Sequence, residues 1–208
     1  MTVPQRRERP SGLLGFIFRR QTSYVRRLSP LFMLCLFGFG FSMLAGYYLG
    51  DTISLALLEE VMGGLPDLAG FDLVQIFFFI VYNNVTKSFF WMVLGVMGGL
   101  PPMFFAVLNG FFIGHFSYHV ALDYSLGFIA AALIPHGVIE IPTILLSSAA
   151  GMGLGYAFIN RLRGQGSLRA EFGKALLLYI TKIMPLLILA AVLEVTLTPI
   201  VVAFLGFV

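Results

Sequence analysis

Long apolar runs separated by short polar stretches dominate this sequence. The runs cover approximately residues 28–50, 73–98, 103–122, 124–160 and 176–199. Each is about 20 residues or longer, which is the length a helix needs to cross the roughly 30 Å hydrocarbon core of a bilayer. None alternates apolar and polar residues as the strands of a transmembrane barrel do. The pattern predicts an all-α fold, a polytopic helical transmembrane bundle of about five spans.

The composition agrees with a membrane protein. Of the 208 residues, 59% are hydrophobic and only 11% are charged, and the mean hydropathy is +0.93. Soluble domains carry about 25% charged residues. A chain with so few charges has too little polar surface to cover a globule in water, so we expect its main partner to be the lipid bilayer.

Basic residues predict the orientation of the spans. Seven arginines lie within residues 1–27, and Arg161, Arg163 and Arg169 follow a later apolar run. Cytoplasmic segments of membrane proteins are enriched in Lys and Arg. We therefore expect a multi-pass protein of the cell membrane with a cytoplasmic N-terminus. The pI of about 9.2 is explained by this asymmetry, and we expect no nucleic-acid partner.

The chain divides into a basic segment and a transmembrane domain. Residues 1–27 are predicted to form a cytoplasmic basic amphipathic segment at the membrane surface. A disordered basic tail that only sets the topology is the alternative. Residues 28–208 form the transmembrane helical domain. Within it, residues 51–72 contain acids but no Lys or Arg and are expected outside, with a short amphipathic helix over 53–62.

Several polar side chains interrupt the apolar runs. They are Asn83, Asn84, Lys87, Asn109, His136, Glu140 and, further along, Glu194. Such side chains are costly in lipid, so they should face protein or a water-filled cavity. We predict that the first six form an intramembrane polar cluster, with Glu194 as a possible addition. Two alternatives for the asparagines are contacts that only hold helices together and caps of a helix broken at that point.

The stretch from Leu133 to Pro142 carries the most informative pair. His136 and Glu140 are four residues apart, so they share one face if a helix begins near Pro135. Proline suits a first helical turn and restricts the residue before it. We therefore expect a broken helix near Pro135, with the preceding half ending near Leu133.

Other candidate ligands are weaker. His115 and His119 are four apart, with Asp123 just beyond, but this spacing matches no known metal motif. Cys35 is the only cysteine, so it forms no internal disulfide and is expected to be a small buried hydrophobe. We predict no metal and no cofactor.

Glycines four residues apart indicate close helix contacts. The pairs are Gly110 with Gly114 and Gly151 with Gly155. Small residues at this spacing allow the backbones of neighbouring helices to approach. The glycine-rich faces also make a homodimer a candidate assembly.

Three function classes fit these features. One is a non-enzymatic scaffold that docks partner proteins, and another is a permease that uses the polar cluster. A chain of this size would need to oligomerise for transport. The third class, an intramembrane hydrolase, lacks the HExxH and Gly-x-Ser-x-Gly motifs, and Ser147-Ser148 has no evident base. We therefore expect that the protein is not an enzyme.

The string from Pro135 to Pro142 resembles the signature of the stage II sporulation protein M family. The resemblance extends to Asn83-Asn84 and Asn109-Gly110, and also to Gly114, Gly151 and Gly155, and so covers roughly residues 30–160. The namesake anchors peptidoglycan-degrading partners during engulfment, although relatives occur in organisms that form no spores. The resemblance implies a membrane scaffold or anchor for partner membrane or envelope proteins. The alternative is a small permease subunit with a polar site around His136 and Glu140.

Overall fold

The computed structural model describes residues 13–54 and 70–206, and throughout these ranges the regular structure is helical, without a strand. The elements are α1 (Leu13–Tyr48), α3 (Leu73–Leu94), α4 (Leu100–Asp123), α5 (Leu126–Leu162), α6 (Leu168–Leu178), the π-helical turn η1 (Tyr179–Ile183) and α7 (Met184–Phe204). Five of the described helical stretches are long and apolar enough to cross a membrane, with α6, η1 and α7 counted as one. The predicted all-α fold with about five spans is confirmed.

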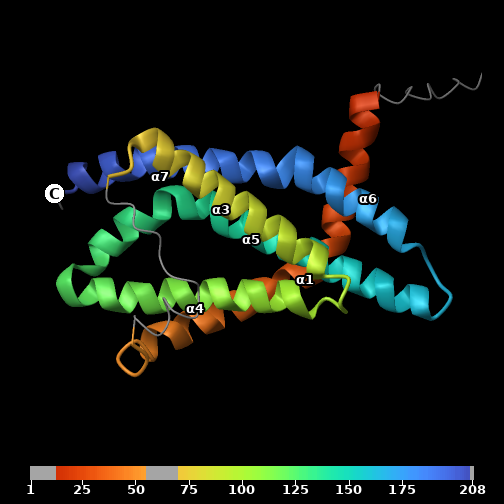
Figure 1. Ribbon diagram of the computed structural model, residues 1–208, viewed down its shortest axis with the longest axis horizontal. Coiled ribbons are helices and arrows are strands. Elements are labelled where there is room, and N and C mark those ends of the chain that lie inside the picture. Colours follow the sequence, from red (N-terminus) through yellow and green to blue (C-terminus); the bar gives the residue numbers. More distant parts are fainter. Residues whose placement is uncertain (1–12, 55–69, 207–208) are drawn as a thin grey trace, which may run out of the picture.

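Apart from the first part of α1, which stands across it, the helices run back and forth along the long axis of the molecule (Figure 1). One end of the bundle, called here the basic end, holds Arg27, Arg161 and Lys174, and the other, the acidic end, holds Asp72 and Asp123. Because the chain crosses an odd number of times, α1 starts at the basic end and α7 finishes at the acidic end (Figure 1).

Capping residues and glycines define where α3 and α4 begin. The Asp72 carboxylate accepts a hydrogen bond from the backbone N–H of Gln75 at 2.8 Å, and the Gln75 side chain accepts one from the N–H of Asp72 at 2.9 Å. This reciprocal capping box fixes the start of α3. Gly98 and Gly99, with φ angles of 78° and 81°, supply the left-handed turn into α4 that other residues rarely adopt.

The expected break at Pro135 is wrong. The helix α5 is continuous and contains both Pro135 and Pro142, although Figure 1 shows that it changes direction within its first half. A proline removes one backbone N–H and pushes its ring against the carbonyl four residues earlier, which bends a helix without always ending it. Packing against neighbouring helices allows α5 to continue past this defect. The alternative break at Asn83 and Asn84 is also absent, because α3 is continuous there.

The C-terminal run crosses once rather than forming a hairpin of two helices. Its α6 and α7 are joined by the wide turn η1 immediately before Pro185. At this turn the Tyr179 hydroxyl donates to the Val85 carbonyl at 2.6 Å and lies 2.9 Å from the Ser88 hydroxyl oxygen. These contacts hold the irregular part of the last span against α3.

The predicted glycine contacts are confirmed. A Cβ atom added at Gly114 would lie 1.8 Å from the Met43 carbonyl oxygen, and one at Gly110 would lie 2.2 Å from that of Phe39. Any side chain there would force α1 and α4 apart. A Cβ atom at Gly155 would likewise lie 2.1 Å from the Gly99 nitrogen. These glycines therefore serve contacts within the chain, and the homodimer stays a prediction.

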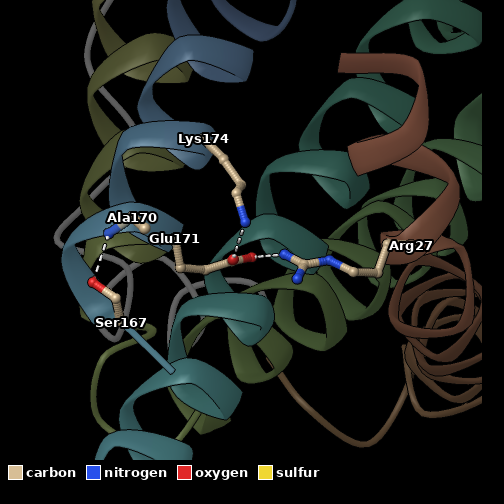
Figure 2. A network of polar contacts seen from close by, with 5 residues as sticks. All are labelled: Arg27, Ser167, Ala170, Glu171 and Lys174. Atoms are coloured by element: carbon tan, nitrogen blue, oxygen red, sulfur yellow. Dashed lines mark hydrogen bonds and ion pairs between the residues drawn. The ribbon is translucent and has the colours of Figure 1, made fainter. Parts of the chain in front are cut away.

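An ion network ties α1 to α6 at the basic end. The Glu171 carboxylate is buried and pairs with Arg27 of α1 and, at 3.3 Å, with Lys174 of its own helix (Figure 2). The hydroxyl of Ser167 caps α6 by accepting from the N–H of Ala170 at 3.3 Å (Figure 2). We call Arg27, Glu171 and Lys174 the basic-end network.

Two sequence predictions fall partly or wholly outside the described residues. Most of the short helix expected over 53–62 lies there, as does the start of the basic segment 1–27. The described part of that segment, from Leu13 onward, is continuous with the first span in α1. Cys35 is fully buried, as expected of a small hydrophobe.

Candidate functional site

Three ionisable side chains from two helices meet within the bundle. One ligand atom each from His136 and Glu140 of α5 and from Glu194 of α7 lies within 4.8 Å of the others. All three side chains are partly buried. Among the described residues, no other group of three or more His, Cys, Asp or Glu side chains brings its ligand atoms this close together. We call these three residues the acid-histidine cluster.

The cluster lies at mid-depth. Asn84 is near the centre of α3, about 15 Å from either end at 1.5 Å per residue. Glu140 accepts a hydrogen bond from Asn84 and so lies at the same level. This depth corresponds to the middle of a hydrocarbon core about 30 Å thick. If α3 spans the hydrocarbon core from end to end, the cluster lies near the bilayer midplane.

Two asparagines of α3 support the carboxylate of α5. The Asn84 Nδ2 donates to Glu140 Oε1 at 3.0 Å, and Asn83 Nδ2 donates to Asn84 Oδ1 at 3.2 Å. The second bond orients the Asn84 amide so that its N–H points toward the carboxylate. The structure thus brings together Asn83, Asn84 and Glu140, three of the residues in the predicted polar cluster.

A threonine of α7 contacts the histidine. His136 Nδ1 lies 3.4 Å from Thr198 Oγ1, and that hydroxyl donates to the Leu193 carbonyl at 3.4 Å. A hydrogen on Nδ1 would satisfy the contact with Thr198 and would leave Nε2 with a lone pair for another partner.

A small cavity adjoins the cluster on the side of α1 and α4. It has a volume of about 70 Å³, and its lining includes His136, Glu140 and Asn109. One water occupies about 30 Å³ of liquid, so the space suits about two waters. The Asn109 amide is held by donating to the Phe105 carbonyl at 2.7 Å.

Lys87 is not brought into this site. Its side chain is exposed, and in the described structure it forms no ion pair with Glu140 or Glu194. It lies one turn closer to the basic end than Asn84, where its long stem can carry the ammonium toward the polar interface. Glu194 is a full member of the site instead of an addition at its edge. The sequence signal was its isolation within an apolar run at the same depth as Glu140.

The charge balance of the cluster is incomplete. Two carboxylates lie close together, whereas the cations Arg27 and Lys174 pair with Glu171 at the basic end instead. Two like charges in a low-dielectric interior repel strongly unless a proton or a cation lies between them. The arrangement is therefore suited to holding a proton or a cation.

His115 and His119 do not form a three-ligand site with Asp123. His115 Nε2 lies 2.7 Å from the Ile53 carbonyl oxygen, and the rings of His115 and His119 are 4.6 Å apart. Asp123 is exposed, and no group that includes it meets the ligand geometry among residues 13–54 and 70–206. The Ser147 hydroxyl donates to the Ser88 carbonyl at 3.0 Å, which serves packing of α5 on α3.

Comparison with known proteins gives a family and two relatives. A family model described as Stage II sporulation protein M matches residues 29–199. The uncharacterized protein MJ0706 of Methanocaldococcus jannaschii is 29% identical over 148 residues, which are 70% of this chain and 63% of that protein. The uncharacterized protein MJ0793 of the same organism is 27% identical over 183 residues, 86% of this chain and 98% of that protein. The chain thus spans less than two thirds of the first relative. No solved structure matches.

Proposed function

The chain belongs to the stage II sporulation protein M family, and for this member we propose the role of a small cation permease or permease subunit. The family and the five apolar helices make it an integral, multi-pass membrane protein. The observation that carries the permease proposal is the convergence of His136, Glu140 and Glu194 within 4.8 Å. Ionisable groups at this depth are costly and typically belong to ion or proton pathways.

The charge of the site supports transport of a positive species. Glu140 and Glu194 come from different helices, and Asn84 reaches Glu140 from a further one. A site between separate helices can change its access when those helices move, as transporter sites near the bilayer midplane do. The neighbouring cavity of about 70 Å³ provides space for water beside the ion.

Irregular helices provide places where such motion can occur. Pro135 and Pro142 interrupt the hydrogen bonding of α5 on either side of Glu140, and Pro199 follows Glu194 on α7. The π-helical turn η1 lies earlier in the same span. Prolines and π-helical turns are recurrent kink and hinge positions. Both carboxylates therefore lie on helices that can bend.

The orientation follows from the basic end. We propose that this end, with its arginines, faces the cytoplasm and that the membrane is the cell membrane, according to the positive-inside rule. The acidic end then faces outside. The N-terminus of α1 would be cytoplasmic and the end of α7 external.

The second candidate is an anchor for partner proteins of the membrane or envelope. Its support is the family assignment rather than the geometry of the cluster. In this role the polar cluster would only hold α3, α5 and α7 in register, and the protein would not be an enzyme. A stable partner that co-purifies equally well with wild-type protein and the Glu140→Gln variant would favour this candidate.

Uptake into proteoliposomes tests the permease proposal. The full chain is reconstituted with an internal pH dye or a metal-quenched dye, and a proton or divalent-cation gradient is applied. We expect wild-type protein to carry the cation and Glu140→Gln and Glu194→Gln to lose nearly all uptake. Lys87→Gln is the matched control, because Lys87 lies on α3, the helix that carries Asn84, but its exposed side chain is outside the cluster. Equal uptake by empty and protein-containing liposomes, for both cation classes, would contradict the proposal.

A further inference from the structure

We propose that His136, Glu140 and Glu194 bind one divalent first-row transition-metal ion, in the range from Mn²⁺ to Zn²⁺. This inference deepens the proposed function, since it rests on the same site and names the class of cation. It reverses the prediction from the sequence that no metal binds. Its basis is the donor set, the charge, the geometry and the supporting contacts of the cluster.

The donor set selects the class of ion. One imidazole nitrogen and two carboxylates combine the ligand that suits Zn, Fe and Ni with the ligand that suits Mn. Ca²⁺ and Mg²⁺ prefer sites built from oxygen alone, so His136 is an unsuitable ligand for them. Cu(I) prefers thiolate and thioether sulfur, and the residues grouped here offer only nitrogen and oxygen.

The charge also favours a divalent ion. Glu140 and Glu194 together carry two negative charges when ionised, and Arg27 and Lys174 pair with Glu171 at the basic end rather than with these two acids. A dication makes the site neutral, which lowers the cost of burying charge in a low-dielectric region. A monovalent cation would leave one negative charge uncompensated.

The geometry is close to that of a metal site. Metal–ligand bonds of about 2.1 Å place neighbouring ligand atoms roughly 3.0–3.4 Å apart and opposite ones roughly 4.2 Å apart. The observed limit is 4.8 Å. Shifts of about 1 Å in the ligand atoms would bring them into this range, and the glutamate side chains have rotatable bonds that allow such shifts.

The outer contacts match those that support metal ligands. Ligating histidines typically donate their other ring N–H to a protein oxygen, and ligating carboxylates accept hydrogen bonds of their own. Thr198 Oγ1 lies 3.4 Å from His136 Nδ1, so a hydrogen on Nδ1 would leave Nε2 for the metal, and Asn84 donates to Glu140. Asn83 in turn orients Asn84.

The cavity offers space for water ligands. Three protein ligands leave positions open on a tetrahedral or octahedral ion. The adjoining cavity of about 70 Å³ is lined by two of the three proposed ligands, His136 and Glu140, and by Asn109. One or two waters held there can therefore reach open positions on the ion.

Metal titration of the full chain in nanodiscs tests the inference. After chelator treatment, Co²⁺ is added as a spectroscopic probe and its visible absorption is recorded, and Mn²⁺ binding is followed by electron paramagnetic resonance. We expect one ion per chain, bound in the presence of excess Mg²⁺ or Ca²⁺. Glu194→Gln should weaken binding by 100-fold or more. Lys87→Gln should leave it unchanged, and gel filtration confirms that each variant is folded.

Two further variants separate this site from adventitious histidine binding. His136→Gln should abolish or shift the visible d–d bands of bound Co²⁺, because it removes the nitrogen ligand. The double variant His115→Gln with His119→Gln should leave these bands unchanged. The inference is overturned if wild-type protein binds no Co²⁺ or Mn²⁺. It is equally overturned if Glu194→Gln binds as wild type or if Mg²⁺ displaces the ion at equal concentration.

Failure of this inference is distinguishable from failure of the proposed function. A chain that binds Co²⁺ through the cluster but carries no Mn²⁺ into liposomes retains the metal site and refutes the permease. A chain that carries protons, loses this activity in Glu140→Gln and binds neither metal retains the permease and refutes the metal site. In that case the two carboxylates hold a proton instead of a metal.

Discussion

Two polar clusters in this protein contain acidic side chains but differ in whether the protein supplies cations to balance their charge. At the basic end, Glu171 is 6% exposed and pairs with both Arg27 and Lys174. At mid-depth, Glu140 and Glu194 lie near each other with His136 and the amide of Asn84. The first cluster is neutralised by cations of the protein itself. The second has ligands but lacks a matching cation, which is the property expected of a binding site.

Depth explains the difference. The Arg27 side chain is 56% exposed, so its guanidinium can stay near water and lipid headgroups while one side contacts Glu171. An arginine or lysine at mid-depth would have no such access and would be costly. A charge-balancing ion that arrives and leaves with water ligands avoids this permanent cost.

The largest effect is expected when both acids of the acid-histidine cluster are neutralised. The double variant Glu140→Gln with Glu194→Gln should bring metal binding and cation uptake below detection, because it removes the charge and two of three ligands. Its melting temperature should not fall, since two repelling charges also disappear. Cation uptake is measured in proteoliposomes, and metal binding and the melting temperature are measured in nanodiscs. A collapse in stability with ordinary uptake would assign the cluster a structural role.

The basic-end network should respond in the opposite way. The double variant Arg27→Ala with Lys174→Ala leaves Glu171 buried without a cation, which should cost about 3 kcal/mol of unfolding free energy. Metal affinity of the folded fraction should not change. Adding Glu171→Ala should recover most of the stability. If the triple variant is no more stable than the double variant, buried charge is not the cause.

Asn84→Ala should produce an intermediate effect. Removing the donor to Glu140 loosens a ligating carboxylate, and lost outer contacts typically lower metal affinity by about 10-fold to 100-fold. Asn83→Ala is the matched variant, because Asn83 contacts Asn84 rather than Glu140, and it should lose less metal affinity. The Co²⁺ titration compares the affinities of the two variants. A larger loss in Asn83→Ala would contradict the order of the hydrogen-bond chain.

Thr198→Val should have a smaller effect than Asn84→Ala. The contact between Thr198 and His136 is long, at 3.4 Å, so its loss should weaken metal binding by less than about 10-fold. Valine keeps the shape but cannot accept the Nδ1 hydrogen. A shift of the Co²⁺ absorption bands with little change in affinity is the expected signature, and a complete loss of binding would argue against it.

Lys87→Gln should have the smallest effect. Its exposed side chain is one turn from Asn84 but outside the site. Binding, uptake and melting temperature should all stay close to wild type. A strong loss of uptake would mean that Lys87 reaches the cluster in another state of the protein.

Local sequence patterns predicted most of the fold. Apolar length identified five spans because each helix must cross the same thickness. Gly110 and Gly114 marked a close contact because no side chain fits there. The helix break predicted at Pro135 was wrong. The rule for proline considers only the local backbone, whereas the continuity of α5 also depends on the helices packed around it.

The site was only partly predictable. His136 and Glu140 share a helix face, which the sequence spacing gives directly. The pairing of Glu194 with Glu140 depends on how α7 lies against α5, and the spacing of residues along the chain does not contain that alignment. Lys87 is a costly polar side chain within an apolar run, but that property does not specify which side of α3 it faces.

X-ray absorption at the cobalt K-edge, on the full chain loaded with Co²⁺ in nanodiscs, would identify the atoms around the ion. We expect nitrogen and oxygen ligands near 2.1 Å with the scattering of one imidazole, which should be lost in His136→Gln. Two imidazoles would place the ion at His115 and His119 instead. That result, or no retained cobalt, would contradict a metal ion at the acid-histidine cluster.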